Sequence, residues 1–129
     1  MARGISKRKI DVAMQLVAAL NTRSPDRVCE LITPDCRFID STGGAIEGAP
    51  AIEAATKKFF KLDPTFRLEI RSSTVRGNEA LLSGQSRSSE PSLNHDTLWR
   101  AKVQDGKVAE FQSFGTQPVP LSHILTSAN

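Results

Sequence analysis

Apolar residues in the first half of the chain recur with the spacing of amphipathic helices. Between residues 6 and 21 they stand three and four positions apart: Ile10, Ala13, Met14, Val17 and Leu20. This spacing predicts a helix with one buried face. A second helix is expected to begin after Ser24, because serine caps a helix N-terminus and Pro25 fits the first turn, and to end near residues 33–35. The same periodicity predicts a third helix over residues 48–62.

From residue 66 onward the apolar period changes to two. Phe66, Leu68 and Ile70 alternate with charged residues, which predicts a strand with one buried face. Further strands are expected over residues 79–89, about 94–103 and 107–114, the last two joined by the turn signal Gln-Asp-Gly at 104–106. A short extended segment at 36–40, closed by a loop at 41–44, precedes the third helix. This order predicts an α+β domain: helices cover one face of a curved, mostly antiparallel sheet and leave a concave space for a ligand.

The chain length and charge distribution refine this picture. With 129 residues, the chain is expected to form one domain over 1–129, with a core over about 8–116 and a loose tail over 116–129. The net charge is +3, but four basic residues and no acidic ones lie in the first ten positions, an arm at 1–9. The rest of the chain carries 13 basic and 14 acidic residues. We therefore expect no nucleic-acid partner. The alternative, non-specific binding through the arm, predicts a steep salt dependence.

Other features limit the environment and the chemistry. No apolar run approaches the roughly 18 residues that a membrane span needs, so we expect no membrane partner. The chain has two cysteines and two histidines, which suggests neither a disulfide framework nor a zinc site. A reduced, cytoplasmic protein without a metal or another cofactor is the expectation.

Several segments resemble, in order and spacing, the nuclear transport factor 2-like superfamily, and within it the ketosteroid isomerases and the SnoaL-like polyketide cyclases. The segments are residues 17–21, 35–40, 48–52 and 99–108, and the resemblance covers roughly residues 8–116. It implies a cone-shaped roll of three N-terminal helices on a curved sheet, the cystatin-like or ketosteroid isomerase-like fold. It also implies a homodimer formed through the outer face of the sheet.

The resemblance implies an enzyme of the isomerase, cyclase or dehydratase type that acts without a cofactor on a small hydrophobic, carbonyl-bearing or polycyclic substrate. The family places a catalytic aspartate at the end of the first short strand, where this chain has Asp40. That residue would act as general base. The alternative for Asp40 is a structural one, in which the carboxylate caps the loop at 41–44 through the backbone.

The chain departs from the family where the developing enolate oxygen would be stabilised. The family supplies a tyrosine on the first helix, but that position falls on Leu16, and the chain has no tyrosine. The family's acid on the penultimate strand falls on or near Thr97, while Asp96 should point outward unless a β-bulge turns it inward. The epoxide hydrolases of this fold use an Asp–Arg–Asp set. Arg100 has no such pair of aspartates beside it, so this chemistry is disfavoured.

Strand alternation places His95 on the inward face of the penultimate strand. There it could form an acid–base pair with Asp40 and donate a hydrogen bond to an oxyanion. The alternative is a histidine at the edge of the sheet, bonded to water. Periodicity and alternation also predict substrate-binding residues in the concave space: Phe38, Phe59, Ser86, Thr97, Trp99, Phe111 and Ser113. The resemblance adds Leu16, which stands at the family's tyrosine position.

Two of these expectations have alternatives. Ser86 shares its alternation with Ser88, so both hydroxyls are expected to face the cavity, or else to lie at the surface as a serine-rich strand end. For the whole chain, the alternative to an enzyme is a non-catalytic ligand-binding or dimerisation module of the same fold. Leu16 and the small number of inward titratable groups favour that alternative.

Overall fold

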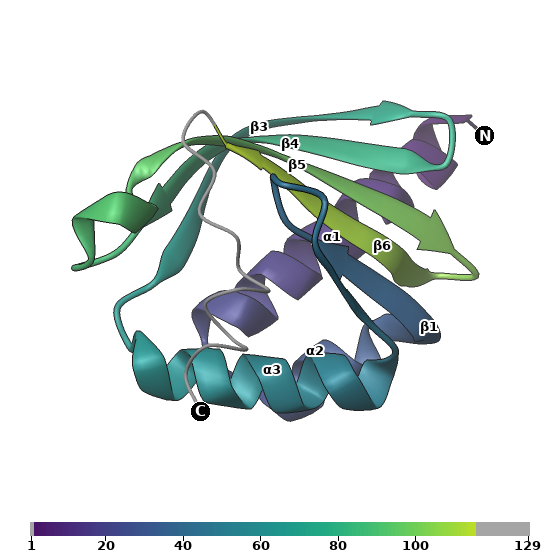
Figure 1. Ribbon diagram of the computed structural model, residues 1–129. Helices are drawn as coiled ribbons and strands as arrows, with labels where there is room; N and C mark the ends of the chain where they lie inside the picture. Colours follow the sequence, from purple (N-terminus) through teal and green to yellow (C-terminus); the bar gives the residue numbers. More distant parts are fainter. Residues whose placement is uncertain (1, 116–129) are drawn as a thin grey trace.

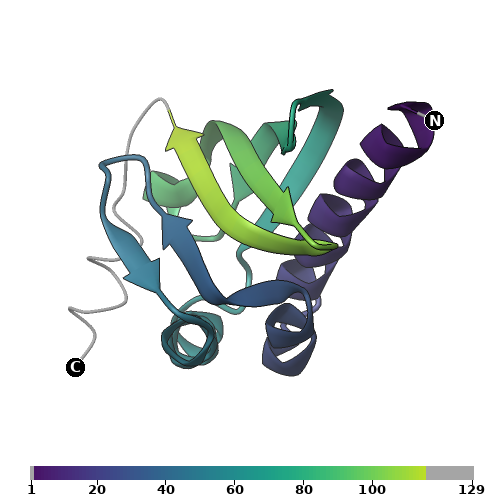
Figure 2. The same cartoon turned by 90° about the vertical axis from the view of Figure 1, so that its right-hand side faces the viewer.

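Three helices cover the concave face of one six-stranded sheet (Figures 1 and 2). The computed structural model describes residues 2–115. The helices are α1 (Ala2–Asn21), α2 (Pro25–Glu30) and α3 (Ala49–Leu62), and η1 (Pro91–Leu93) is a single 3₁₀ turn. The strands are β1 (Ile32–Ile39), β2 (Ala45–Glu47), β3 (Arg67–Arg76), β4 (Glu79–Arg87), β5 (His95–Gln104) and β6 (Lys107–Gly115). This is the predicted α+β roll, which confirms the fold class.

The strand order is β2-β1-β6-β5-β4-β3, and every pair is antiparallel except β1 with β6. The hairpin between β5 and β6 turns at Asp105 and Gly106, whose φ angles of 53° and 77° lie in the left-handed region. Two successive positive φ values are what a two-residue hairpin turn requires. Figure 2, in which α3 is seen nearly end-on, shows the sheet curving over the helices.

The structure corrects several predicted boundaries. Helix α1 begins at Ala2, so the predicted arm continues the helix as far as residue 2, and the predicted tail at 116–129 lies outside the described residues. Strand β1 begins at Ile32, four residues earlier than expected. A register shift between Ile32 and Arg37 in its pairing with β6 lets it include Pro34, because a bulge tolerates a residue without a backbone donor. Strand β2 was not predicted, because it has only three residues, all paired with β1, and so short a strand shows no alternation in the sequence.

The core lies between α1 and the sheet. The apolar stripe of α1 supplies buried Ala13, Leu16 and Val17, and the sheet supplies Leu82 and Val108 among others. Burial of such side chains contributes about 1.5–3 kcal/mol each for the larger ones. The helical and strand periodicities therefore meet in one apolar layer between α1 and the sheet.

A glycine on β4 allows the sheet to curve. The pairing of β3 with β4 shifts register between Ile70 and Ser72, opposite Gly84. A Cβ atom at Gly84 would lie 1.8 Å from the carbonyl oxygen of Glu69. The two strands approach so closely here that no side chain fits, and the bulge increases the local twist of β3.

The outer face of the sheet is partly apolar and partly charged. Leu98 and Phe114 are cross-strand partners that are 56% and 45% exposed. Beside them, Arg100 forms ion pairs with Glu79 and Glu110. The homodimer expected through this face stays a prediction.

Within residues 2–115 there is no helix long and apolar enough to span a membrane.

Candidate functional site

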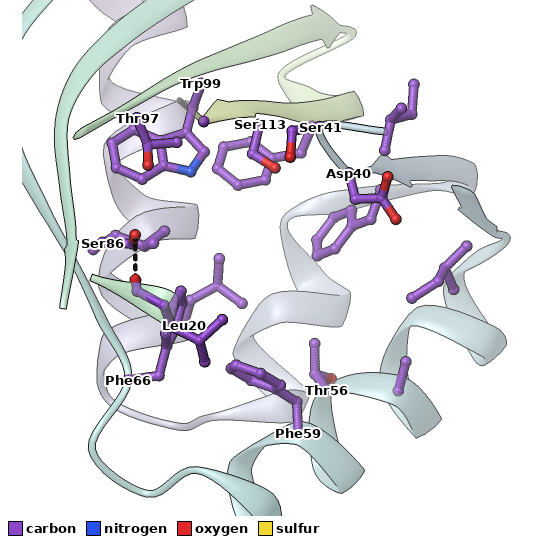
Figure 3. Close-up of a pocket in the computed structure, with 18 of the residues that line it drawn as sticks. Leu20, Asp40, Ser41, Thr56, Phe59, Phe66, Ser86, Thr97, Trp99 and Ser113 are labelled. Carbon is purple, nitrogen blue, oxygen red and sulfur yellow. Dashed lines mark hydrogen bonds between the residues drawn. The ribbon is translucent and has the colours of Figure 1, made fainter. Parts of the chain in front are cut away.

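A cavity of about 110 Å³ lies between α3 and the concave face of the sheet (Figure 3). It is much larger than the space that a single water molecule needs. Both predicted catalytic residues, Asp40 and His95, line it. So do seven of the eight predicted substrate-binding residues: Phe38, Phe59, Ser86, Thr97, Trp99, Phe111 and Ser113.

Leu16 is the exception among the predicted lining residues. Its side chain is fully buried in the core and is not part of the cavity wall, whereas Leu20, one helical turn later, is. The prediction placed Leu16 by resemblance to the position of a tyrosine, which is longer than leucine. Leu20 could have been found from the sequence, because it continues the apolar stripe of α1. Other lining residues, Leu93 and Ile46, come from η1 and β2, which have no clear signal in the sequence.

Aromatic rings form two walls of the cavity. Phe38 and Phe111, on the parallel neighbours β1 and β6, pack with ring centroids 5.7 Å apart. On the opposite side, Phe59 of α3 meets Phe66 edge to face at 5.0 Å. Tilted and edge-to-face pairs are the favourable arrangements of aromatic rings. The walls are therefore apolar and well packed, and suit the flat faces of a ring-containing ligand.

Trp99 brings a hydrogen-bond donor into this apolar space. Only 3% of the residue is exposed, and its indole nitrogen points into the cavity (Figure 3). The Nε1–H group has no hydrogen-bond partner among residues 2–115. The Nε1 atom is not among the fully buried unpaired polar atoms of the described residues, so it is accessible from the cavity. The cavity thus presents a donor that an acceptor atom of a ligand would satisfy.

Asp40 both lines the cavity and caps the loop that follows it. The residue is 3% exposed. Its Oδ1 accepts hydrogen bonds from the Thr42 amide at 2.9 Å, the Thr42 hydroxyl at 2.7 Å and the Gly44 amide at 2.9 Å. Figure 3 shows the carboxylate directed away from Trp99 and Thr97. The loop-capping alternative for Asp40 is therefore realised, while its role as a general base stays a prediction.

His95 stands at the start of β5, where its Nδ1 lies 3.0 Å from Thr97 Oγ1 and 3.3 Å from the carbonyl oxygen of Asp96. These contacts hold the imidazole on its own strand, and the predicted acid–base pair with Asp40 stays a prediction. Asp96 is exposed and accepts a hydrogen bond from Gln85 at 3.0 Å. Its outward position agrees with the strand alternation, because β4 and β5 pair here without a bulge.

The two serines of β4 and its end have different surroundings. Ser86 is buried and donates to the carbonyl oxygen of Leu93 at 2.6 Å, which ties η1 to the cavity wall (Figure 3). Ser88 does not line the cavity, so for this residue the alternative of a strand end holds. Its hydroxyl donates to Asp63 instead, because β4 ends at Arg87 and the alternation stops there.

The carboxylate of Asp63 that Ser88 contacts is itself perturbed. Burial acts to raise the pKa of Asp63, but hydrogen bonds from Ser88 and Thr65 outweigh it, so that the pKa lies below its ordinary value.

Arg100, the candidate arginine for epoxide chemistry, lies on the outer face of the sheet with Glu79 and Glu110, so it does not reach the cavity.

The cysteines show no sign of reactivity. Burial raises the pKa of Cys36 to about 12, and burial together with the nearby Glu53 raises the pKa of Cys29 to about 11. Thiols with such values are poor nucleophiles at neutral pH. In the part of the chain that the structure describes, no group of three or more potential ligand side chains is placed to hold a metal ion.

Comparisons with known proteins agree with this architecture. The family model of the SnoaL-like domain matches residues 13–111. A proposed polyketide cyclase from Sinorhizobium meliloti is 22% identical, covers 80% of this chain and 93% of its own, and superposes with a TM-score of 0.72. A proposed ketosteroid isomerase from Kribbella flavida is 18% identical over 85% of this chain and 78% of its own, with the same TM-score of 0.72. An epoxide hydrolase from M. tuberculosis is 14% identical over 85% and 84%, also at 0.72. Among curated proteins, none matches the sequence.

Proposed function

Because this chain belongs to the family of SnoaL-like domains, we propose that its cavity binds a small, mainly apolar molecule that carries a carbonyl group. The aromatic walls would contact the ring system of such a molecule, and burial of apolar surface would supply most of the binding free energy. The carbonyl oxygen would accept a hydrogen bond from the cavity and fix the orientation of the ligand.

One observation carries this proposal: the indole Nε1–H of Trp99 points into the cavity without a partner in residues 2–115. Against apolar surroundings, a hydrogen bond is stronger and an unmet donor is more costly than in water. A ligand with an acceptor at this position is therefore favoured over a hydrocarbon of the same shape. The expected advantage is one neutral hydrogen bond, about 0.5–1.5 kcal/mol, or roughly a two- to tenfold difference in Kd.

Ligand binding can be measured by tryptophan fluorescence. Trp99 is its only tryptophan and there is no tyrosine, so the intrinsic fluorescence reports on the cavity alone. We expect α-tetralone to change this emission saturably and to bind more tightly than tetralin, which has the same rings without the carbonyl. Equal affinity of the two compounds would contradict the assignment of Trp99, and absence of saturable binding by either would contradict the cavity as a ligand site.

A second candidate function is catalysis with Asp40 as general base. It is favoured by the position of Asp40, which is buried in the cavity wall at the end of β1 and held by three hydrogen bonds on Oδ1. In this mechanism, Asp40 takes a proton from an enolisable carbon, next to the carbonyl or conjugated with it, and Trp99 donates to the enolate oxygen that forms. Returning the proton to another carbon gives isomerase chemistry. Attack of the enolate carbon on a second carbonyl of the same molecule gives cyclase chemistry, and loss of a β-hydroxyl group as water gives dehydratase chemistry.

The two candidates differ in a measurable way. In D₂O, a base in the cavity exchanges the α-protons of bound α-tetralone for deuterium, which NMR detects without knowledge of the natural substrate. Catalysis predicts exchange above the uncatalysed rate, which Asp40→Asn abolishes and Thr42→Val, a change in the same loop, largely preserves. Saturable binding without such exchange, both for α-tetralone and for a longer conjugated enone, would assign the protein to the binding function.

A further inference from the structure

We infer that His95 is held with its proton on Nδ1, so that Nε2 accepts a hydrogen bond from a donor group of the ligand. The inference about the ligand rests on the proposed binding function, while the state of the imidazole follows from contacts within the protein. Together they specify a ligand with both an acceptor and a donor, such as a hydroxylated cyclic ketone.

The contacts of Nδ1 decide where the proton lies. The carbonyl oxygen of Asp96, 3.3 Å away, can only accept. Thr97 Oγ1 lies 3.0 Å from Nδ1 and also 3.2 Å from the carbonyl oxygen of His95, to which it can donate. If Nδ1 carries the proton, it donates toward Asp96 and Thr97, and the Thr97 hydroxyl donates to the His95 carbonyl.

The other neutral tautomer satisfies fewer of these groups. With the proton on Nε2, the lone pair of Nδ1 would face the lone pairs of the Asp96 carbonyl oxygen. The single hydroxyl proton of Thr97 would then go to Nδ1, and the carbonyl of His95 would lose this donor and keep the 3.3 Å contact with the hydroxyl of Ser86. Thr97 is buried, so water cannot readily replace the bonds of its hydroxyl, whereas the carbonyl oxygen of Asp96 is exposed and can bind water. The arrangement therefore selects the Nδ1–H tautomer. In general, the hydrogen bonds of one ring nitrogen decide which nitrogen of a histidine carries the proton.

The imidazole lies at the cavity wall, and its Nε2 atom is not engaged by the described part of the protein. The imidazole packs against the backbone of Gly115 on β6, where a Cβ atom would lie only 2.6 Å from His95 Cε1. His95 is part of the cavity wall, and its Nε2 has no hydrogen-bond partner among residues 2–115. With Nδ1 occupied, Nε2 is the imidazole nitrogen left for a ligand, and in this tautomer it carries a lone pair.

This assignment changes the role expected for the imidazole. The sequence suggested that His95 donates to an oxyanion, whereas the contacts make it an acceptor. The donor role falls to Trp99 on the same strand, four residues away on the same face. The cavity then offers one donor and one acceptor among apolar walls, which favours a ligand that pairs a carbonyl oxygen with a hydroxyl group.

The tautomer is tested by NMR without any ligand. In ¹⁵N-labelled protein at alkaline pH, where imidazoles are neutral, we expect a pyrrole-type shift for Nδ1 and a pyridine-type shift for Nε2 of His95. The chain has two histidines, so the loss of one set of signals in His95→Gln assigns them. Thr97→Val should reduce the preference for this tautomer about fivefold, and Thr97→Ser should retain it. The reverse pattern of shifts in the unaltered protein would overturn the inference.

The ligand class is tested separately by Trp99 fluorescence. We expect at least one ring-hydroxylated isomer of α-tetralone to bind roughly two- to tenfold more tightly than its methoxy counterpart, which lacks the donor. His95→Phe should abolish this difference while both compounds still bind. Equal affinities for every hydroxy and methoxy pair would overturn the ligand class. If α-tetralone itself does not bind, the proposed function fails, and the NMR result still decides the tautomer.

Discussion

Replacing Asp40 by alanine separates the structural role of this residue from its possible chemistry. The substitution removes three hydrogen bonds from the loop, donated by the Thr42 amide, the Thr42 hydroxyl and the Gly44 amide. A typical bond of this kind contributes about 0.5–1.5 kcal/mol net. We therefore expect Asp40→Ala to lower the free energy of unfolding by about 3 kcal/mol, which is a large share of the stability of a domain this size.

Two further variants divide this loss. Thr42→Val removes only the hydroxyl bond and should cost about 1 kcal/mol. Asp40→Asn keeps an amide oxygen that can accept the same three bonds, but it loses the charge that strengthens them, so it should also cost about 1 kcal/mol. Because Asp40 and Thr42 are in contact, the double variant Asp40→Ala with Thr42→Val should be less destabilised than the two single losses combined.

Urea unfolding followed by the fluorescence of Trp99 measures these differences, with linear extrapolation to water. An Asp40→Ala variant within about 0.5 kcal/mol of the unaltered protein would refute the reasoning, since surface substitutions without a structural role fall in that range. A stable Asp40→Asn variant is also what the deuterium-exchange assay needs, because it allows loss of exchange to be distinguished from loss of the fold.

Three other predictions concern stability and assembly. Gly84→Ala should destabilise the protein by about 3 kcal/mol or more, because its Cβ would lie 1.8 Å from a backbone oxygen of β3; a urea midpoint near that of the unaltered protein would contradict this close approach. Because the folded pKa of Asp63 is lowered, its contribution to stability is present at neutral pH and is lost as the pH falls below about 4, and Ser88→Ala should flatten this acid limb of a stability–pH curve. For the expected dimer, Phe114→Lys on the outer face should shift sedimentation toward the monomer while Met14→Lys on α1 does not, and a monomeric unaltered protein would contradict the dimer.

Strand alternation predicted the cavity well, and it did so for a physical reason. Successive side chains of a strand point to opposite faces, so the apolar Trp99 fixes the inward position of Thr97 and His95 on β5 once the register is regular. The same reasoning correctly placed Asp96 outward. At Ser88 alternation left two alternatives open, and the strand end holds, because alternation applies only while the strand continues and β4 ends at Arg87.

The parts of the site that the sequence did not reveal depend on contacts between distant or irregular segments. Strand β2 has only three residues and is defined by its pairing with β1, so the sequence shows no alternation of apolar and polar residues that would predict it. The capping of the loop by Asp40 was one of two alternatives, and only the geometry of Thr42 and Gly44 showed that it forms. Leu16 shows the opposite error: its family position was transferred, but a leucine there fills the core and leaves Leu20 to line the cavity.

The missing tyrosine gives the donor at Trp99 its significance. In the isomerase resemblance, an enolate oxygen needs a hydrogen-bond donor, and neither Leu16 nor any tyrosine can supply one here. The indole N–H of Trp99 reaches the cavity from the sheet instead of from α1, so a carbonyl bound to it would lie near the β5 side of the cavity. The carboxylate of Asp40 is directed away from Trp99, so catalysis would require a ligand long enough to reach from the indole to β1. Ligand length is therefore a variable for the exchange assay. If Asp40 is the base, a conjugated enone with three or more fused rings, whose enolisable γ-carbon is remote from the carbonyl, should exchange faster than α-tetralone. Binding alone predicts no such dependence.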